Sequence, residues 1–160
     1  MGVNYYGSNN INTLLQSNTF KNPKVSAVKF DSDAAIIDAD ISNNTISITE
    51  PTTKMRSIFV GYTRKAPNTV KHDIAFTNNN ITYEATARGS ATEEYAYYLA
   101  TNNTSIKNNT IQSAVANLYA IGNSSDSKLN LYFTNNKFSG VKNDLSRFNL
   151  LENGGNTITK

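Results

Sequence analysis

The stretch Ile106-Lys-Asn-Asn-Thr-Ile111 places two isoleucines five residues apart. Side chains alternate between the two faces of a strand, so an odd spacing would send these isoleucines to opposite sides of a sheet. The same frame recurs at 41–46 (ISNNTI), 76–81 (FTNNNI) and 133–138 (FTNNKF). A frame of apolar, x, Asn, Asn, x, apolar that returns this often indicates one structural element built several times.

The odd spacing is explained if the asparagines lie at a bend between two short strands. Asn tolerates the left-handed backbone region better than other residues with a side chain, and such a bend turns both flanking apolar groups inward. In stacked coils each Asn amide would donate to one neighbour and accept from the other, whereas stacked aspartates would place like charges about 4.8 Å apart. The predicted ladder consists of Asn18, Asn44, Asn79, Asn109, Asn136 and Asn156.

Six frames are found when the chain is aligned on the closing apolar residue. They end at Phe20, Ile46, Ile81, Ile111, Phe138 and, more loosely, Ile158. Their separations vary between 20 and 35 residues, which is irregular for a helical repeat and normal for stacked coils whose loops differ in length. Apolar runs such as VSAVKF and KLNLYF lie between the frames. The pattern predicts about six coils with two or three strands each.

The composition favours an ordered chain and excludes several chemistries. Although 25 of the 160 residues are asparagine, they alternate with dense apolar and aromatic segments, which argues against disorder. With no cysteine and a lone histidine, His72, neither a disulfide framework nor a Ser-His triad is possible. The net charge of +3 is spread along the chain, and no apolar run approaches the roughly 18 residues of a membrane span. We therefore expect no metal, cofactor, nucleic-acid partner or membrane insertion.

The length predicts one β-helical domain over residues 1–160, complete or as part of a longer chain. Residues 1–10 lack the features of a signal peptide and are predicted to form a lead-in segment. The longest insertion, residues 50–72, holds two prolines and a group of basic residues, and is predicted to protrude as a loop.

The ordered succession of Asn-Asn frames resembles the right-handed parallel β-helix, or pectin-lyase-like, family. The resemblance covers residues 11–158 and implies an all-β, right-handed parallel β-helix. That fold serves polysaccharide lyases, glycoside hydrolases, bacterial surface adhesins and bacteriophage tailspikes, so the fold alone does not select a function.

Enzymes of this family use carboxylates on adjacent coils, so the acidic residues are candidates for catalysis. A glycosidase needs two carboxyl groups about 5 to 10 Å apart. The candidates are Asp38, Asp40, Glu84, Glu93 and Glu94, together with Arg88. A solvated surface is the competing interpretation, and no loop with the ligand spacing of a calcium site is present.

Tyrosines supply a second type of candidate, because sugar rings stack on aromatic faces. The predicted glycan-binding residues are Tyr95, Tyr97, Tyr98, Tyr119 and Tyr132. Strand alternation would put Tyr95 and Tyr97 on one face and Tyr98 on the other, so at least one of these three is expected to point into the core. Packing or an oligomer contact is the alternative role.

From the resemblance we expect a module of a phage tailspike or tail fibre that contacts a bacterial surface polysaccharide. A polysaccharide lyase or glycoside hydrolase, and a segment of a bacterial adhesin, are the alternatives. The expected location is the virion tail, the extracellular space or the cell surface. Because a short stack exposes backbone groups at its ends, and phage spikes assemble as trimers, a homo-oligomer, most simply a trimer, is expected.

Overall fold

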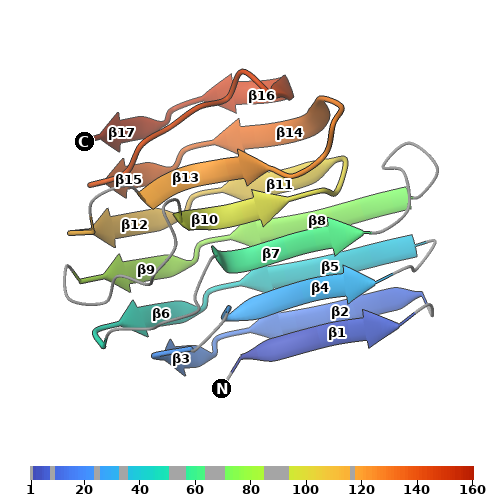
Figure 1. Ribbon diagram of the computed structural model, residues 1–160, viewed down its shortest axis with the longest axis horizontal. Helices are drawn as coiled ribbons and strands as arrows, with labels where there is room; N and C mark the ends of the chain where they lie inside the picture. The colour runs from blue at the N-terminus through green and yellow to red at the C-terminus, as the bar shows by residue number, and fades with distance from the viewer. Residues whose placement is uncertain are drawn as a thin grey trace.

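The computed structural model describes residues 2–7, 10–23, 26–32, 36–50, 57–63, 71–84, 94–115 and 118–160. These residues form strands, turns and bends that stack as successive coils from the N-terminus to the C-terminus (Figure 1). None of the described segments is a helix long and apolar enough to cross a membrane.

Three parallel sheets make up the described stack. Sheet A contains β1 (Val3–Gly7), β4 (Val28–Ser32), β7 (Ser57–Thr63), β10 (Glu94–Leu99) and β13 (Leu118–Asn123). Sheet B contains β2 (Ile11–Gln16), β5 (Ile36–Ser42), β8 (Lys71–Thr77), β11 (Thr104–Lys107), β14 (Leu129–Thr134) and β16 (Phe148–Gly154). Sheet C contains β3 (Thr19–Lys21), β6 (Thr45–Ile48), β9 (Asn80–Tyr83), β12 (Thr110–Ser113), β15 (Lys137–Ser139) and β17 (Thr157–Thr159).

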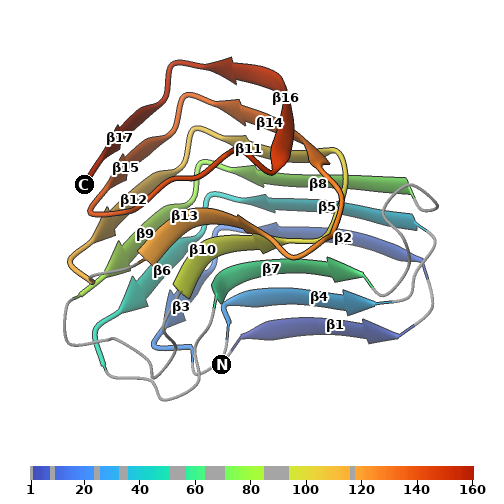
Figure 2. The ribbon, with the colours of Figure 1, turned by 45° about the horizontal axis from the view of Figure 1, so that its top comes forward.

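The first five coils pass through sheets A, B and C in turn, and the described part of the last coil adds β16 to sheet B and β17 to sheet C (Figure 2). Neighbouring strands of a sheet pair in parallel. The register brings equivalent frame positions together; Ile106, for example, is the partner of Phe76 on one side and Phe133 on the other. The predicted all-β fold, a parallel β-helix of about six coils with an Asn ladder, is therefore confirmed.

Two predictions about the ends and loops need correction. Within the predicted lead-in, residues 1–10, strand β1 pairs with β4 and is part of the first coil. Within the predicted loop, residues 50–72, strand β7 pairs with both β4 and β10 in the middle of sheet A. Strand β7 thus has a neighbour on each side in sheet A, while residues 51–56 and 64–70 lie outside the described part.

The two central residues of each frame, most often both asparagine, have different structural roles. The residue at the first position takes the left-handed conformation, with φ between 55° and 57° at Asn43, Asn78, Asn108 and Asn135 and 57° at Ser17. Gly155 takes this place in the last frame, with φ of 66°. The residue at the second position is the one that forms the ladder, so the bend and the ladder belong to adjacent residues.

The predicted ladder is confirmed at all six positions. Asn79 is typical: its Oδ1 accepts from the backbone N–H and the Nδ2 of Asn44, both at 3.0 Å. Its own Nδ2 donates to Asn109 Oδ1 at 3.1 Å and to the carbonyl of Ile41 at 2.9 Å. Every hydrogen-bonding group of this buried amide is thus used, which is the condition for burying it without penalty. The same pattern links Asn18, Asn44, Asn109, Asn136 and Asn156.

The apolar residues that flank the frames fill the interior. Ile41 and Ile46 are fully buried on either side of one bend, as the odd spacing predicted. Aromatic rings continue the column along the stack: the centroid of Phe59 lies 5.0 Å from that of Phe76 and 5.2 Å from that of Tyr97. The core is therefore filled by side chains from all three sheets of each coil.

Two tyrosines lie inside this core with different hydroxyl environments. Tyr83 donates to Glu94 Oε2 at 2.6 Å, and burial, followed by the hydrogen bond and the negative charge of Glu94, raises the Tyr83 pKa. Tyr97 is fully buried and its hydroxyl has no hydrogen-bond partner in the described structure, so burial alone raises its pKa.

Substitution of these tyrosines by phenylalanine should have opposite effects on stability. Tyr97→Phe removes an unpaired buried hydroxyl and is expected to raise the free energy of unfolding by about 1 kcal/mol, whereas Tyr83→Phe leaves the buried Glu94 without this donor and should lower it by about 1–3 kcal/mol. Urea denaturation of both variants measures this. Equal losses in the two variants would contradict the assigned environments.

Candidate functional site

Three tyrosines meet on the outside of sheet A. Tyr95 and Tyr98 come from β10 and Tyr119 from the adjacent β13, and all three are half-buried. The ring centroid of Tyr95 lies 5.1 Å from that of Tyr98 and 5.5 Å from that of Tyr119. We call Tyr95, Tyr98 and Tyr119 the tyrosine ridge. Ring contacts at these distances are favourable and fix the three side chains relative to one another.

The ridge depends on a break in the alternation along β10. Ala96 and Tyr97 are consecutive and both buried, so Tyr95 and Tyr98 return to the same outer side of the sheet. The neighbouring β13 shows the same break, with Ala120 and Ile121 both buried. The prediction that Tyr95 and Tyr97 share a face is therefore wrong, because simple alternation does not hold through this part of sheet A.

A glycine supports the ridge from the next strand. A Cβ atom at Gly122 of β13 would lie 2.4 Å from Cδ1 of Tyr95. The Tyr95 ring therefore packs directly over the Gly122 backbone, in space that any larger residue would occupy. This is the kind of close approach for which glycine is required.

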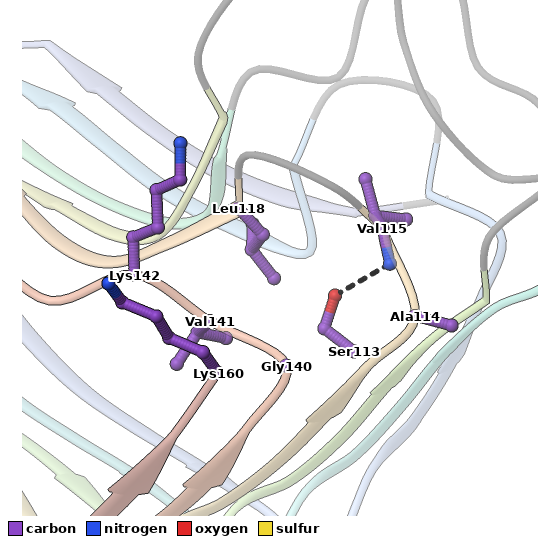
Figure 3. Close-up of a pocket in the computed structure, with 8 residues that line it drawn as sticks. All are labelled: Ser113, Ala114, Val115, Leu118, Gly140, Val141, Lys142 and Lys160. Carbon is purple, nitrogen blue, oxygen red and sulfur yellow. Dashed lines mark hydrogen bonds between the residues drawn. The ribbon is translucent and has the colours of Figure 1, made fainter.

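An open pocket of about 330 Å³ is formed by residues at the ends of β12, β13, β15 and β17 and in the segments next to them (Figure 3). It is lined by Ser113, Ala114, Val115, Leu118, Gly140, Val141, Lys142 and Lys160. Figure 3 shows the two lysines on one side and residues 113–115 on the other, where Ser113 Oγ accepts from the Val115 N–H at 3.1 Å. The floor is therefore apolar and the rim carries positive charge.

Lys142 joins the pocket to the ridge. It forms a β-bridge with Tyr119, and its Nζ lies 5.5 Å from the centroid of the Tyr119 ring. A lysine over an aromatic face gains about 0.5–1 kcal/mol at an exposed site. Lys142 is thus shared by the lining of the pocket and the surroundings of the ridge.

Two predicted glycan-binding tyrosines do not belong to this surface. Tyr97 is in the core, so its predicted contact with a ligand is wrong. Tyr132 is half-buried on β14 of sheet B, where its ring lies 5.5 Å from Lys107 Nζ. Lys107 in turn pairs with Glu152 at 3.0 Å. Tyr132 therefore lies on a different sheet from the ridge, and the five tyrosines do not form one strip.

The acidic candidates are dispersed. Asp38 and Asp40 lie on β5 of sheet B, and Asp40 accepts from Gln16 Nε2 at 3.0 Å. Glu84 is exposed just after β9, and Glu94 is buried and bonded to Tyr83. The remaining two candidates, Glu93 and Arg88, lie outside the described residues.

The structure brings together one pair of carboxylates that the sequence does not indicate as a pair. Asp38 and Asp73 are register partners on the adjacent strands β5 and β8, and both are exposed. In the described part of the chain, no group of three or more His, Cys, Asp or Glu side chains is placed to hold a metal ion.

Sequence reasoning missed Lys142 and Gly122. Neither stands in a recognisable motif, and each acquires its place from the pairing of sheet A: Gly122 is the register partner of Tyr98, and Lys142 that of Tyr119. Comparison of the chain with protein-family models, with curated proteins and with solved structures gives no match.

Proposed function

We propose that this chain is a carbohydrate-recognition module that holds a bacterial surface polysaccharide against the tyrosine ridge. The observation that carries the proposal is the ridge itself, three half-buried tyrosines from adjacent coils with ring centroids 5.1 and 5.5 Å apart. Sugar rings present apolar C–H faces that stack on aromatic faces, and their polar groups need partners nearby. Lys142 and Lys160 at the adjoining pocket supply donors for hydroxyl or acidic groups of the sugar.

The biological setting that we propose is a phage tailspike or tail fibre. Its support is the resemblance of the repeated Asn-Asn frames to the parallel β-helix family, which includes bacteriophage tailspikes, together with the parallel β-helix that carries the ridge. A stacked fold suits a linear polymer, because equivalent positions of successive coils lie about 4.8 Å apart along one line.

Removal of an aromatic face should weaken glycan binding. Tyr119→Ala is expected to reduce the affinity for a bound capsular or cell-wall polysaccharide by about 5- to 150-fold, which corresponds to about 1–3 kcal/mol for an aromatic hot spot. Isothermal titration calorimetry against polysaccharides selected on a glycan array gives the affinity, and circular dichroism verifies the fold.

Two further variants make this test specific. Gly122→Ala should also weaken binding, because the new methyl group displaces the Tyr95 ring without removing it. Tyr132→Ala, which removes an equally half-buried tyrosine from sheet B, should leave the affinity unchanged. Binding that is lost in Tyr132→Ala and kept in Tyr119→Ala would reject the ridge as the site.

A second candidate function, glycoside hydrolysis, is favoured by the pairing of Asp38 with Asp73. Adjacent strands are about 4.8 Å apart, close to the roughly 5 Å that separates the carboxyl groups of retaining glycosidases. Shortening of the polysaccharide on incubation with the chain, abolished in Asp38→Asn, would support this function. Retention of the polymer at full length would support recognition alone.

A further inference from the structure

The pocket lies between two stretches of chain that differ in length. At one end Gln112 of β12 pairs with Ser139 of β15. At the other end Tyr119 of β13 pairs with Lys142. The path from Gln112 to Tyr119 takes seven steps along the chain, whereas the path from Ser139 to Lys142 takes three. The shorter path cannot follow the longer one throughout, and the pocket is lined by residues of both.

A glycine holds the shorter path against the longer one. Gly140 has a φ of 70°, and a Cβ atom there would overlap the carbonyl oxygen of Ser113, so this approach requires glycine. The N–H groups of Gly140 and Val141 both donate to the carbonyl of Thr159, at 2.9 and 3.4 Å. The N–H of Lys142 is also bonded within the protein. This wall of the pocket is therefore fixed by its backbone.

The lining offers a ligand apolar contacts and cations. Val115, Leu118 and Val141 are buried and supply the apolar floor. Lys142 and Lys160 lie together on one side (Figure 3), and each ammonium group carries three donors. The backbone N–H groups of residues 114, 115 and 140–142 already donate to protein acceptors. Among the described residues of the lining there is no Asp or Glu.

This combination selects a ligand that is both anionic and partly apolar. A wholly apolar group would displace water from the ammonium groups and give them no partner, which is costly. A small polar anion would leave the apolar floor in contact with water. A volume of about 330 Å³ is at the lower end of the range for small-molecule sites, so the pocket suits one compact unit and not a length of polymer.

We propose that this pocket takes one acidic sugar unit, with its carboxylate toward the two lysines and an acetyl group on the apolar floor. The choice of a sugar rests on the proposed function. Lys142 connects the two sites, because it lines the pocket and its Nζ lies 5.5 Å from the centroid of the Tyr119 ring. A unit in the pocket is then followed by a unit stacked on Tyr119. The substrate class is an acetylated acidic polysaccharide.

A single sugar tests the pocket directly. N-acetylneuraminate carries a carboxylate and an acetyl group, and its titration into the ¹⁵N-labelled chain should shift the amide signals of residues 140–142 saturably. Its methyl ester, which lacks the charge, and its analogue with a hydroxyl in place of the acetamido group should each bind roughly 5- to 10-fold more weakly. Equal affinity for the three sugars, or equal shifts with inorganic phosphate, would overturn the proposal.

A charge-removing variant tests the role of the lysine. Lys142→Gln should weaken the binding of N-acetylneuraminate by about 5-fold and leave the binding of its methyl ester unchanged, because the variant removes only the charge. Lys128→Gln is the matched control, since Lys128 is exposed just before β14 and lies outside the lining. A loss in the control as large as in Lys142→Gln, or equal losses for the acid and the ester, would contradict the assignment.

The polysaccharide separates this inference from the proposed function. Affinity for an acetylated acidic polysaccharide that falls in both Tyr119→Ala and Lys142→Gln would support both. A loss in Tyr119→Ala alone would keep recognition at the ridge and overturn the assignment of the pocket. A loss in Lys142→Gln alone would keep the pocket and reject the ridge. Isothermal titration calorimetry gives the affinities, and circular dichroism verifies that each variant is folded.

Discussion

Asn79→Ala is expected to lower the free energy of unfolding by about 3–5 kcal/mol, since it leaves several buried polar groups without partners at about 1–3 kcal/mol each. Asn79 Oδ1 accepts from two groups of Asn44, and its Nδ2 donates to Asn109 and to the carbonyl of Ile41. Water cannot replace these partners, because the site is 1% exposed. Guanidinium denaturation measured by circular dichroism gives the change.

The adjacent residue supplies the control. Asn80 follows Asn79 directly, points outward from β9 and is exposed. Asn80→Ala should change the free energy of unfolding by no more than about 0.5 kcal/mol, as is usual for surface positions. Comparable losses of unfolding free energy in Asn79→Ala and Asn80→Ala would mean that the ladder hydrogen bonds stabilise the fold no more than an exposed asparagine side chain does.

Alkaline conditions should unfold the chain cooperatively, because Tyr83 and Tyr97 resist ionisation in the folded state. Burial is the largest cause at both sites and raises the pKa of each phenol above its ordinary value of about 10. The unfolded chain then binds fewer protons than the folded chain above that pH, so stability falls as the pH rises. Each tyrosine contributes a slope of about 1.4 kcal/mol per pH unit, and the pair about twice that.

Chemical denaturation between pH 8 and 12 measures this slope. Below pH 10 both phenols are protonated in both states, so this contribution to stability is fully present there and the slope from these residues should be close to zero. In Tyr97→Phe the slope above pH 10 should fall by about half, because one of the two buried phenols is gone. An unchanged slope in that variant would show that Tyr97 ionises as readily in the folded chain as in the unfolded one.

The sequence predicts part of the candidate binding surface, and the tertiary structure decides the rest. The sequence indicates the tyrosines of β10 as candidates, and Tyr95 and Tyr98 meet Tyr119 on one surface in the structure. The sequence does not indicate that Tyr97 is the tyrosine that points inward, because Ala96 and Tyr97 are consecutive and both buried, which simple alternation along a strand does not predict. Nor did it indicate that Tyr132 would lie on sheet B.

The sequence by itself determined the coil and the ladder. A bend needs a residue that accepts the left-handed conformation, and Asn108 meets this requirement. A stacked polar position needs a side chain that both donates and accepts hydrogen bonds, and the adjacent Asn109 meets that one. Because the requirement returns in every coil, its repetition could be recognised without knowledge of any contact between distant residues.

Only the tertiary structure decided which side chains share a surface. Sheet A pairs residues that are far apart in the chain, and the loops between them differ in length, so the neighbours of Tyr119 follow from the register and not from the spacing along the sequence. Lys142 reaches the ridge through such a pairing, and Gly122 makes room for Tyr95 through another. Recognition surfaces on a stacked fold are assembled across coils, and for that reason no single segment of the sequence contains one.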